Sequence, residues 1–223
     1  VVSGDMTGDG IPEFANCTEY NTILLVYDIK GNKLWDRGIN LFGHFEMADI
    51  NGDKKMEIIH TAYSNKIGTM QFSFFNATGE IFKTLNLNTP YSNFTIIHWP
   101  DRNGKPHLLL ISTNRMDVVN MDGRTLGSLD APGCRDEGKV TAVNVKFKAG
   151  EQDYLAVRKS EFPLKVLYVY NPQGKLVYQK TDSSSDLEAA LLAVPAENGR
   201  EKLLTSTYDP KNMADVIKIM EYT

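Results

Sequence analysis

Four short segments of the chain repeat one pattern, which limits the folds open to it more than any other feature does. Each segment has an apolar run, then Asn or Asp, two further residues, Gly, and a second apolar run. An Asx side chain can cap its own turn, and a Gly three residues later can adopt the positive φ that closes a tight hairpin. The pattern therefore predicts four β-hairpins, whose turns lie at 28–31, 76–79, 120–123 and 171–174.

The spacing of these hairpins indicates a structural repeat. Their Asx residues are 44 to 51 positions apart, and a period in this range with four strands in each unit is typical of a β-propeller blade. We predict an all-β chain that forms a single β-propeller domain over residues 1–223, built from about five four-stranded antiparallel blades. The repeat units are approximately 1–40, 41–88, 89–132, 133–182 and 183–223.

The last predicted unit ends one strand short of the repeat. Propellers commonly complete one blade with strands from both ends of the domain, because an unpaired edge strand is prone to pair with other chains. Two alternatives stay open: a closed five-blade ring, and part of a larger propeller whose missing strand lies upstream of Val1. Residues 186–193 are compatible with a short helix, but their place in the repeat favours an inner strand.

Composition narrows the possible partners. The net charge is −4 with a pI near 5.6, and no basic stripe indicates a nucleic-acid partner. No apolar run approaches the about 18 residues of a membrane span, so we expect none within this chain. Cys17 and Cys134 fall in units that are not neighbours in a five-blade ring, whereas a disulfide needs Cα atoms within about 7 Å. Either both are reduced, or one pairs with a cysteine elsewhere.

Two acidic loops follow the predicted inner strands of units one and two. Both place oxygen-bearing side chains at loop positions one, three, five and nine, and Gly at position four. Such oxygens suit a hard cation such as Ca²⁺, and the backbone carbonyl at position seven can add a ligand. An EF-hand would need flanking helices, whereas strands are predicted here. The candidate metal ligands are Asp5, Thr7, Asp9, Glu13 and the carbonyl of Ile11, and Asp49, Asn51, Asp53, Glu57 and the carbonyl of Lys55.

These loops resemble the calcium loop of FG-GAP or VCBS propeller repeats, the type found in the N-terminal region of integrin α chains. Thr7 stands where that family usually has Asn or Asp. The resemblance implies two structural calcium ions, one in each loop, on the propeller face opposite the ligand-binding loops. The corresponding loop of unit three has Lys105 at position five and Leu109 at position nine, so we expect no calcium there. Extracellular modules bind calcium at about 10⁻⁴ to 10⁻³ M, which implies a secreted, periplasmic or cell-surface protein.

The face opposite the calcium loops is the expected ligand face. The longest loops predicted on this face span 158–165, 207–212 and 88–93, and long loops on a rigid scaffold commonly carry binding residues. Arg158, Phe162 and Tyr208 are the predicted anchors. Tyr20, Tyr63 and Trp99 are further aromatic candidates, although aromatic side chains at these places also suit packing between blades.

Signs of catalysis are few. No histidine or cysteine spacing typical of a metal enzyme and no Gly-x-Ser-x-Gly elbow occurs. His44, Glu46 and His98 fall on predicted inner strands near the propeller axis, where they could line a solvated channel or act as a base. A polysaccharide lyase would also need cations to neutralise a uronate, which Arg115, Arg158, Lys159 and Lys211 could supply from predicted loops.

The sequence thus favours an extracellular, calcium-stabilised β-propeller that recognises a glycan or an extracellular protein. One alternative is a carbohydrate-active enzyme such as a polysaccharide lyase. Another is a scaffold segment of a larger surface protein, in which the propeller acts as a spacer.

Overall fold

The computed structural model shows a chain made of antiparallel strands. It describes residues 1–18, 22–39, 43–64, 69–88, 91, 93–135, 138–161, 164–183, 191–209, 211 and 214–220. The one helical segment in these ranges is the short 3-10 turn η1 (Glu197–Gly199). Within the same ranges, no helix has the length and apolar character needed to cross a membrane. The predicted all-β class is confirmed.

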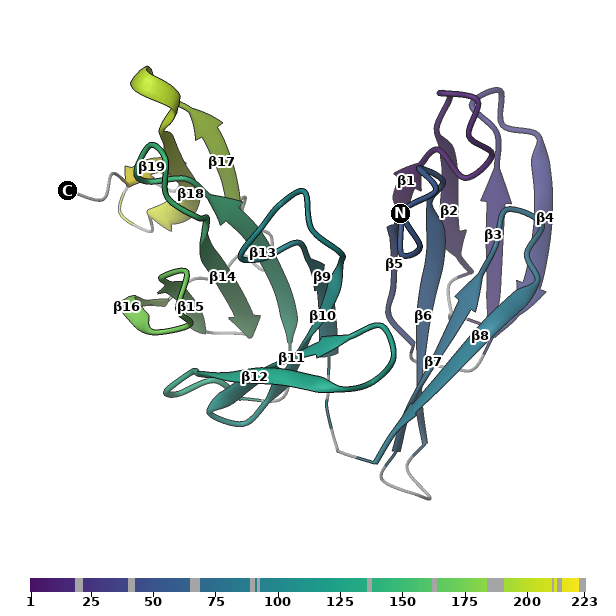
Figure 1. Cartoon of the computed structure of the whole chain (residues 1–223), viewed down its shortest axis with the longest axis horizontal. Helices are drawn as coiled ribbons and strands as arrows, with labels where there is room; N and C mark the ends of the chain where they lie inside the picture. Colours follow the sequence, from purple (N-terminus) through teal and green to yellow (C-terminus); the bar gives the residue numbers. More distant parts are fainter. Residues whose placement is uncertain are drawn as a thin grey trace. The chain divides into compact units, whose positions relative to one another are not determined.

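The first two sheets each contain four consecutive strands (Figure 1). Short connections join neighbouring strands, so each pair is antiparallel and each sheet is a simple meander. One sheet contains β1 (Val2–Gly4), β2 (Glu13–Cys17), β3 (Ile23–Tyr27) and β4 (Lys33–Gly38). The next contains β5 (Phe45–Ala48), β6 (Glu57–Ser64), β7 (Thr69–Phe75) and β8 (Ile81–Leu87).

The remaining strands form two further four-stranded meanders and one sheet in which three strands are described. They are β9 (Asn93–Ile97), β10 (His107–Ser112), β11 (Arg115–Asn120) and β12 (Thr125–Asp130); β13 (Lys139–Val145), β14 (Tyr154–Glu161), β15 (Leu164–Tyr170) and β16 (Leu176–Ser183); and β17 (Leu191–Pro195), β18 (Glu201–Asp209) and β19 (Ala214–Met220). The prediction of a strand, and not a helix, over 186–193 is confirmed from Leu191 onward, and residues 186–190 lie outside the described part.

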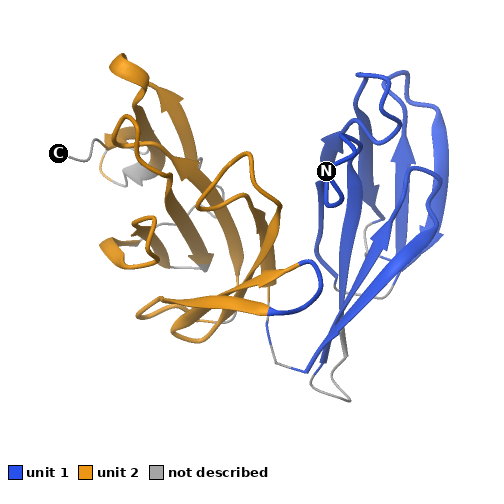
Figure 2. Cartoon of the chain, in the orientation of Figure 1, with its two compact units in different colours: residues 1–91, 121–124 blue, residues 92–120, 125–223 orange. Residues whose placement is uncertain are grey.

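The chain packs as two compact units, which Figure 2 distinguishes by colour. The first comprises residues 1–91 with the turn at 121–124, and the second comprises residues 92–120 and 125–223. The four-stranded antiparallel sheets are confirmed, whereas a single propeller domain over residues 1–223 stays a prediction.

The Asx-to-Gly hairpins form as the sequence predicts, between the third and fourth strands of each four-stranded sheet. In the turn after β7, the Asn76 Oδ1 atom accepts the N–H groups of Thr78 and Glu80 at 3.0 and 2.9 Å. Gly79 follows with a φ of +76°. Asp28 and Asn171 cap their turns in the same way. After each of the four turns the pairing register shifts because the fourth strand has one extra residue opposite the third, which is a β-bulge. The extra residues are Leu34, Phe82, Leu126 and Val177.

Packing between sheets follows the period of two along the strands. In the second unit, Leu155 and Val157 of β14 join one apolar cluster with Trp99, Tyr168 and Tyr170. The intervening Ala156 points to the other face and joins a cluster that includes side chains of β15, β17 and β18. The sheet β13–β16 is therefore buried on both faces here, which explains why β15 and the first half of β14, Tyr154 to Val157, are almost continuously apolar.

Gly79 combines two structural demands, and a pair of alanine variants separates them. Its φ is positive, and a Cβ there would lie 2.7 Å from the ring of Trp35, which also donates a hydrogen bond to the Ala77 carbonyl at 2.9 Å. Gly31 has the same backbone conformation in open space. We expect Gly31→Ala to cost about 1 kcal/mol in unfolding free energy, and Gly79→Ala to cost about 2 to 3 kcal/mol because Trp35 must also move. Urea melts of both variants measure the difference, and equal losses would contradict it.

Candidate functional site

The first acidic loop joins β1 to β2 and is held by hydrogen bonds to its own backbone. The Asp5 carboxylate accepts the N–H groups of Gly8 and Gly10 at 2.6 and 2.8 Å. The Asp9 Oδ1 atom accepts the Ile11 N–H at 2.8 Å, and Glu13 Oε2 accepts the N–H of Met6 at 2.7 Å. The predicted ligands at positions one, five and nine therefore belong to one closed loop, with Thr7 exposed at position three.

The second acidic loop joins β5 to β6 and repeats this arrangement. The Asp49 carboxylate accepts the N–H groups of Gly52 and Lys54 at 2.6 and 2.9 Å. The Glu57 carboxylate accepts the Ile50 N–H at 3.0 Å and an amide hydrogen of Asn51 at 3.1 Å. The matching fifth position is Asp53, whose Oδ1 accepts the N–H of Lys55 at 2.8 Å. Two loops of different sequence thus share one hydrogen-bond pattern.

The backbone angles show that the two loops also share a fold. Gly8 and Gly52, at position four, have φ values of +82° and +86°. At position six, Gly10 has a φ of +83° and Lys54 has one of +69°. A lysine rarely adopts this conformation and costs about 1 kcal/mol or more there. The second loop therefore adopts this conformation although a lysine, and not a glycine, stands at position six.

The charges in each loop are suited to a cation. Glu13 and Glu57 are buried, with 4 and 5 % of their surface exposed. Burial raises the pKa of Glu57; the Ile50 N–H opposes this effect, and the charges of Asp53 and Asp49 add to it. Burial also tends to raise the pKa of Asp5, but its backbone N–H donors, led by that of Gly10, outweigh it and lower the pKa. Several anionic oxygens so close together repel one another, and a bound cation would relieve this repulsion.

The donor set of each loop fits a hard cation: carboxylate oxygens, a hydroxyl or amide oxygen, and a backbone carbonyl, with neither nitrogen nor sulfur. Within the described ranges, no group of three or more His, Cys, Asp or Glu side chains converges on one point. The carboxylates at positions one and five instead accept loop N–H groups, and each carboxylate oxygen has more than one lone pair. The residues therefore fit calcium, while the ion itself remains a proposal.

The loop between β9 and β10, which is the matching loop of the third repeat unit, is organised by an arginine. Arg102, in the β9–β10 loop, places its Nε 2.6 Å from Asp153 Oδ2 and donates two hydrogen bonds of 2.8 Å to the carboxylate of Glu201. Asp153 immediately precedes β14 and Glu201 begins β18. Both acids thus lie where the second strand of their sheet begins, as Glu13 and Glu57 do in the compact unit of residues 1–91 and 121–124. For Asp153 and Glu201, in the other compact unit, the partner is a guanidinium group.

The Arg102 cluster is well satisfied. The Asp153 side chain is 4 % exposed, and the Glu201 carboxylate also accepts the Lys146 N–H at 2.8 Å. The hydrogen bond from Arg102 lowers the pKa of Glu201, with burial opposing it, and both acids raise the pKa of Arg102. The sequence prediction missed this cluster because its members are 51 and 99 positions apart. The sequence signal that could have found it is the acidic residue at the start of the second strand in repeat units four and five, Asp153 and Glu201.

The weak catalytic candidates are distributed over both units. His44 Nε2 lies 3.1 Å from Glu46 Oε1 in the first unit. His98 belongs to the second unit, where its Nδ1 lies 3.1 Å from the Gly104 carbonyl oxygen. Of the three, only Glu46 lies within a strand, while His44 precedes β5 and His98 follows β9. His44 and Glu46 therefore form a local pair. The prediction that these residues lie on strands is wrong for His44 and His98.

Several residues assigned to exposed loops lie in strands. Arg158 is on β14 and 4 % exposed; its guanidinium donates hydrogen bonds to Thr205 Oγ1 and, at 2.7 Å, to the Ser206 carbonyl. The prediction of Arg158 as an exposed loop anchor is therefore wrong, and Lys159, 2 % exposed, is misplaced in the same way. The backbone of Tyr208 pairs with Asp215 inside β18, so it too lies in a strand. Phe162 lies outside the described residues.

The other named residues have ordinary structural settings. Arg115 begins β11 and pairs with Asp117 at 2.9 Å. Trp99 is buried and donates to the Asp153 carbonyl at 2.8 Å, so its role is packing. Cys17 and Cys134 form no disulfide with each other, as predicted. Lys211 is exposed, Tyr63 lies on β6, and Tyr20 lies outside the described part.

Comparisons with known proteins agree with the fold. No known family matches the sequence, and no curated protein matches it. Among solved structures, the chain resembles BBS1N in complex with ARL6DN (10 % identity, TM-score 0.58, 92 % of this chain and 62 % of that one). It also resembles the Dos1 propeller, with 13 % identity and a TM-score of 0.52 over 98 % of this chain and 57 % of that one. The Pan2 WD40 domain of Neurospora crassa has 9 % identity and a TM-score of 0.52 over 99 % of this chain and 65 % of that one.

These likenesses concern the fold alone, because sequence identity is low. The chain spans 57 to 65 % of the length of these three structures. The sheets of this chain therefore have the architecture of β-propeller blades, in agreement with the period of the Asx-to-Gly hairpins.

Proposed function

We propose that the chain is a β-propeller recognition module for a protein ligand, stabilised by calcium in its first two sheets. The observation that carries the calcium part is the shared hydrogen-bond pattern of the two acidic loops, including the positive φ of Lys54. A conformation held against the preference of its own residue is found where function needs it.

Each ion would be held by side-chain oxygens at positions one, three, five and nine and by the carbonyl at position seven. Bound calcium would neutralise the acidic loop and join the start of the second strand to the end of the first. Its role is structural, because the ligands all come from a single loop. The ligands are those predicted from the sequence, from Asp5 to Glu13 and from Asp49 to Glu57.

A protein ligand is favoured by the nature of the structural neighbours. One of them, BBS1N, was solved in complex with ARL6DN. The lyase alternative is weakened because Arg158 and Lys159 are buried rather than presented on loops. We further propose that the five sheets are five blades of the propeller, either a closed ring or part of a larger one. Calcium sites with dissociation constants of about 10⁻⁴ to 10⁻³ M would be filled in an extracellular or periplasmic setting.

The proposed recognition function is tested by probing protein arrays and glycan arrays in parallel. The whole chain is applied in 2 to 10 mM calcium and again after chelation, at a temperature where it stays folded. The proposal expects saturable binding to a protein that weakens when calcium is removed. Binding to glycans alone would contradict it. Release of an ultraviolet-absorbing unsaturated product from polyuronates would instead favour the lyase.

A further inference from the structure

The two acidic loops are joined by a single peptide group, the one between Lys55 and Met56. The Met56 N–H of the second loop donates a hydrogen bond of 2.8 Å to the backbone carbonyl of Asp5 in the first loop. The carbonyl of the same peptide group belongs to Lys55, the predicted ligand at position seven of the second loop. Asp5 is the predicted ligand at position one of the first loop. One planar, rigid group therefore connects a ligand residue of each proposed calcium site.

Side chains pack along the same contact. The stem of Lys55 covers Gly8, at position four of the first loop, because a Cβ on Gly8 would lie 2.9 Å from Lys55 Cε. The Met56 side chain lies against Gly4, at the end of β1, where a Cβ would lie 2.7 Å from Met56 Cγ. Met56 also packs against the apolar cluster that the first two sheets share. A movement of either loop is therefore passed to the other through this contact.

The same type of link joins other neighbouring sheets of the chain. In the second compact unit, the Asp153 N–H donates to the Pro100 carbonyl at 3.3 Å, and the Glu201 N–H donates to the Lys146 carbonyl at 2.7 Å. In each case the donor lies at or just before the start of a second strand, and the acceptor follows the first strand of the preceding sheet. The link is therefore part of the architecture and does not depend on an acidic loop.

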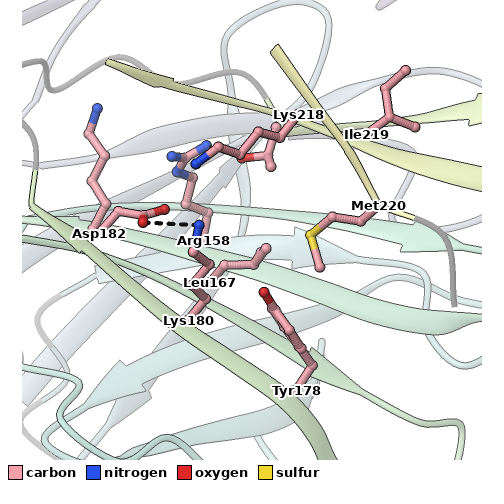
Figure 3. Close-up of a pocket in the computed structure, with 10 residues that line it drawn as sticks. Arg158, Leu167, Tyr178, Lys180, Asp182, Lys218, Ile219 and Met220 are labelled. Atoms are coloured by element: carbon pink, nitrogen blue, oxygen red, sulfur yellow. Dashed lines mark hydrogen bonds and ion pairs between the residues drawn. The ribbon is translucent and has the colours of Figure 1, made fainter. Parts of the chain in front are cut away.

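One of these pairs of sheets, β13–β16 and β17–β19, is also joined by a charged side chain. Arg158 of β14 donates a hydrogen bond of 2.7 Å to the Ser206 carbonyl of β18. Figure 3 shows the pocket between these sheets, with Arg158 extending toward the strand that carries Lys218. Neither end of the backbone link between these two sheets carries a predicted calcium ligand. The first two sheets differ, because both ends of their link do.

We propose that the two calcium sites are coupled through the Lys55–Met56 peptide group, so that filling the second loop strengthens binding at the first. This inference rests on the proposed calcium function and adds its regulation. A carbonyl that ligates a cation is polarised, and the N–H of the same peptide group becomes a stronger donor. Met56 then holds Asp5 more firmly, so less ordering remains when the first loop binds its own ion. By thermodynamic linkage, filling the first loop strengthens binding at the second by the same factor.

Repulsion between the two cations opposes this coupling, and ionic strength separates the two effects. Charges that interact through water are screened, and at about 1 M salt the screening length falls to about 3 Å. The hydrogen bond from Met56 to Asp5 is a direct contact between the loops, so salt screens it far less. Titrations in about 1 M KCl therefore report the peptide link with little contribution from repulsion between the ions.

The test is calorimetric titration of the whole metal-stripped chain with calcium in this buffer. Asp49→Ala removes the position-one ligand of the second loop, and Asp5→Ala removes the matching ligand of the first loop while keeping its backbone carbonyl. The wild-type association constant for both ions should exceed the product of the two single-site constants about fivefold or more. Two bound ions without this excess would overturn the coupling and leave the calcium function standing. A wild type that binds no calcium would overturn both.

Variants of Met56 locate the coupling in the peptide group. Met56→Pro removes the N–H, and proline suits the loop fold because the first loop has Pro12 at the same position eight. The matched control is Met56→Ala, which also loses the long side chain but keeps the N–H. Both variants should bind two ions, and only Met56→Pro should lose the excess over the product of its single-site constants.

These single-site constants are measured after adding Asp49→Ala or Asp5→Ala to each Met56 variant. Circular dichroism verifies that every variant folds. An equal excess in Met56→Pro and Met56→Ala would show that the N–H carries no coupling and would overturn the proposal. If Met56→Pro does not fold, the comparison of the wild type with Asp49→Ala and Asp5→Ala still decides it.

Discussion

An Arg102→Met variant is expected to lose about 3 kcal/mol of unfolding free energy, the lower end of the cost of leaving a buried charge without its partner. Arg102 is the group that pairs with both Asp153 and Glu201. The Asp153 side chain is 4 % exposed, so water cannot replace the lost guanidinium. The Arg102 side chain is 39 % exposed, which limits the effect to this range.

Urea melts measure this loss against two controls. Arg200→Met removes an exposed arginine one residue before Glu201, and it should change stability by less than about 0.5 kcal/mol. Arg102→Lys keeps the charge but loses the two-pronged geometry, so it should fall between the wild type and Arg102→Met. Equal stability of Arg102→Met and the wild type would show that the cluster contributes nothing.

The same cluster sets a dependence on pH. The hydrogen bond from Arg102, opposed by burial, lowers the pKa of Glu201 below its ordinary value of 4.5. A carboxylate with a lowered folded-state pKa stabilises the protein above its unfolded-state pKa, and this contribution is lost as the pH falls through the folded-state pKa. The wild type should therefore lose more stability than Arg102→Met between about pH 5 and pH 3. Parallel pH profiles of the two proteins would contradict this assignment.

Removing calcium is expected to have the other large effect. For a dissociation constant of about 10⁻⁴ M, 10 mM calcium stabilises the folded state by up to about 2.7 kcal/mol per site. With about 2 to 4 °C per kcal/mol for a chain of this size, filling one site should raise the melting temperature by about 5 to 10 °C. Thermal melts in calcium and in excess chelator measure the difference.

The variant Asp49→Ala separates metal binding from turn capping. Asp49 accepts the N–H groups of Gly52 and Lys54, so its loss should cost about 1 kcal/mol even in chelator. The loss should be clearly larger in calcium. The matched control is Asp101→Ala in the third loop, where Asp101 accepts the N–H of Asn103 and no calcium is expected. For this control the loss should be the same in both conditions, and the same result for Asp49→Ala would assign it to capping alone.

The features that were predictable from the sequence are those encoded within a few residues. The turn of Asn76 and Gly79 requires an Asx side chain and a positive φ, and both are visible in the letters. The acidic loops are equally local, since Asp5 and Glu13 lie within nine positions of one chain. Local chemistry of this kind predicts the hairpins, the strands and the members of each loop.

The features that were missed depend on contacts between sheets. The charged run from Arg158 to Glu161 suggests a loop, but these residues continue β14, whose backbone pairs there with β13 and β15. The guanidinium of Arg158 donates to Thr205 and Ser206 of the next sheet. Arg102 finds its partners 51 and 99 positions away, where no local pattern marks them. Strand propensity and turn chemistry cannot anticipate such long-range pairing.

The most direct test of the account is the number of calcium ions that the chain binds. Calorimetric titration of the metal-stripped protein counts them, with magnesium titrated in parallel. The two matched loops predict a stoichiometry near two for the wild type, near one for Asp49→Ala, and near two for Asp101→Ala. A wild-type stoichiometry near zero, or magnesium binding as tightly as calcium, would contradict the account.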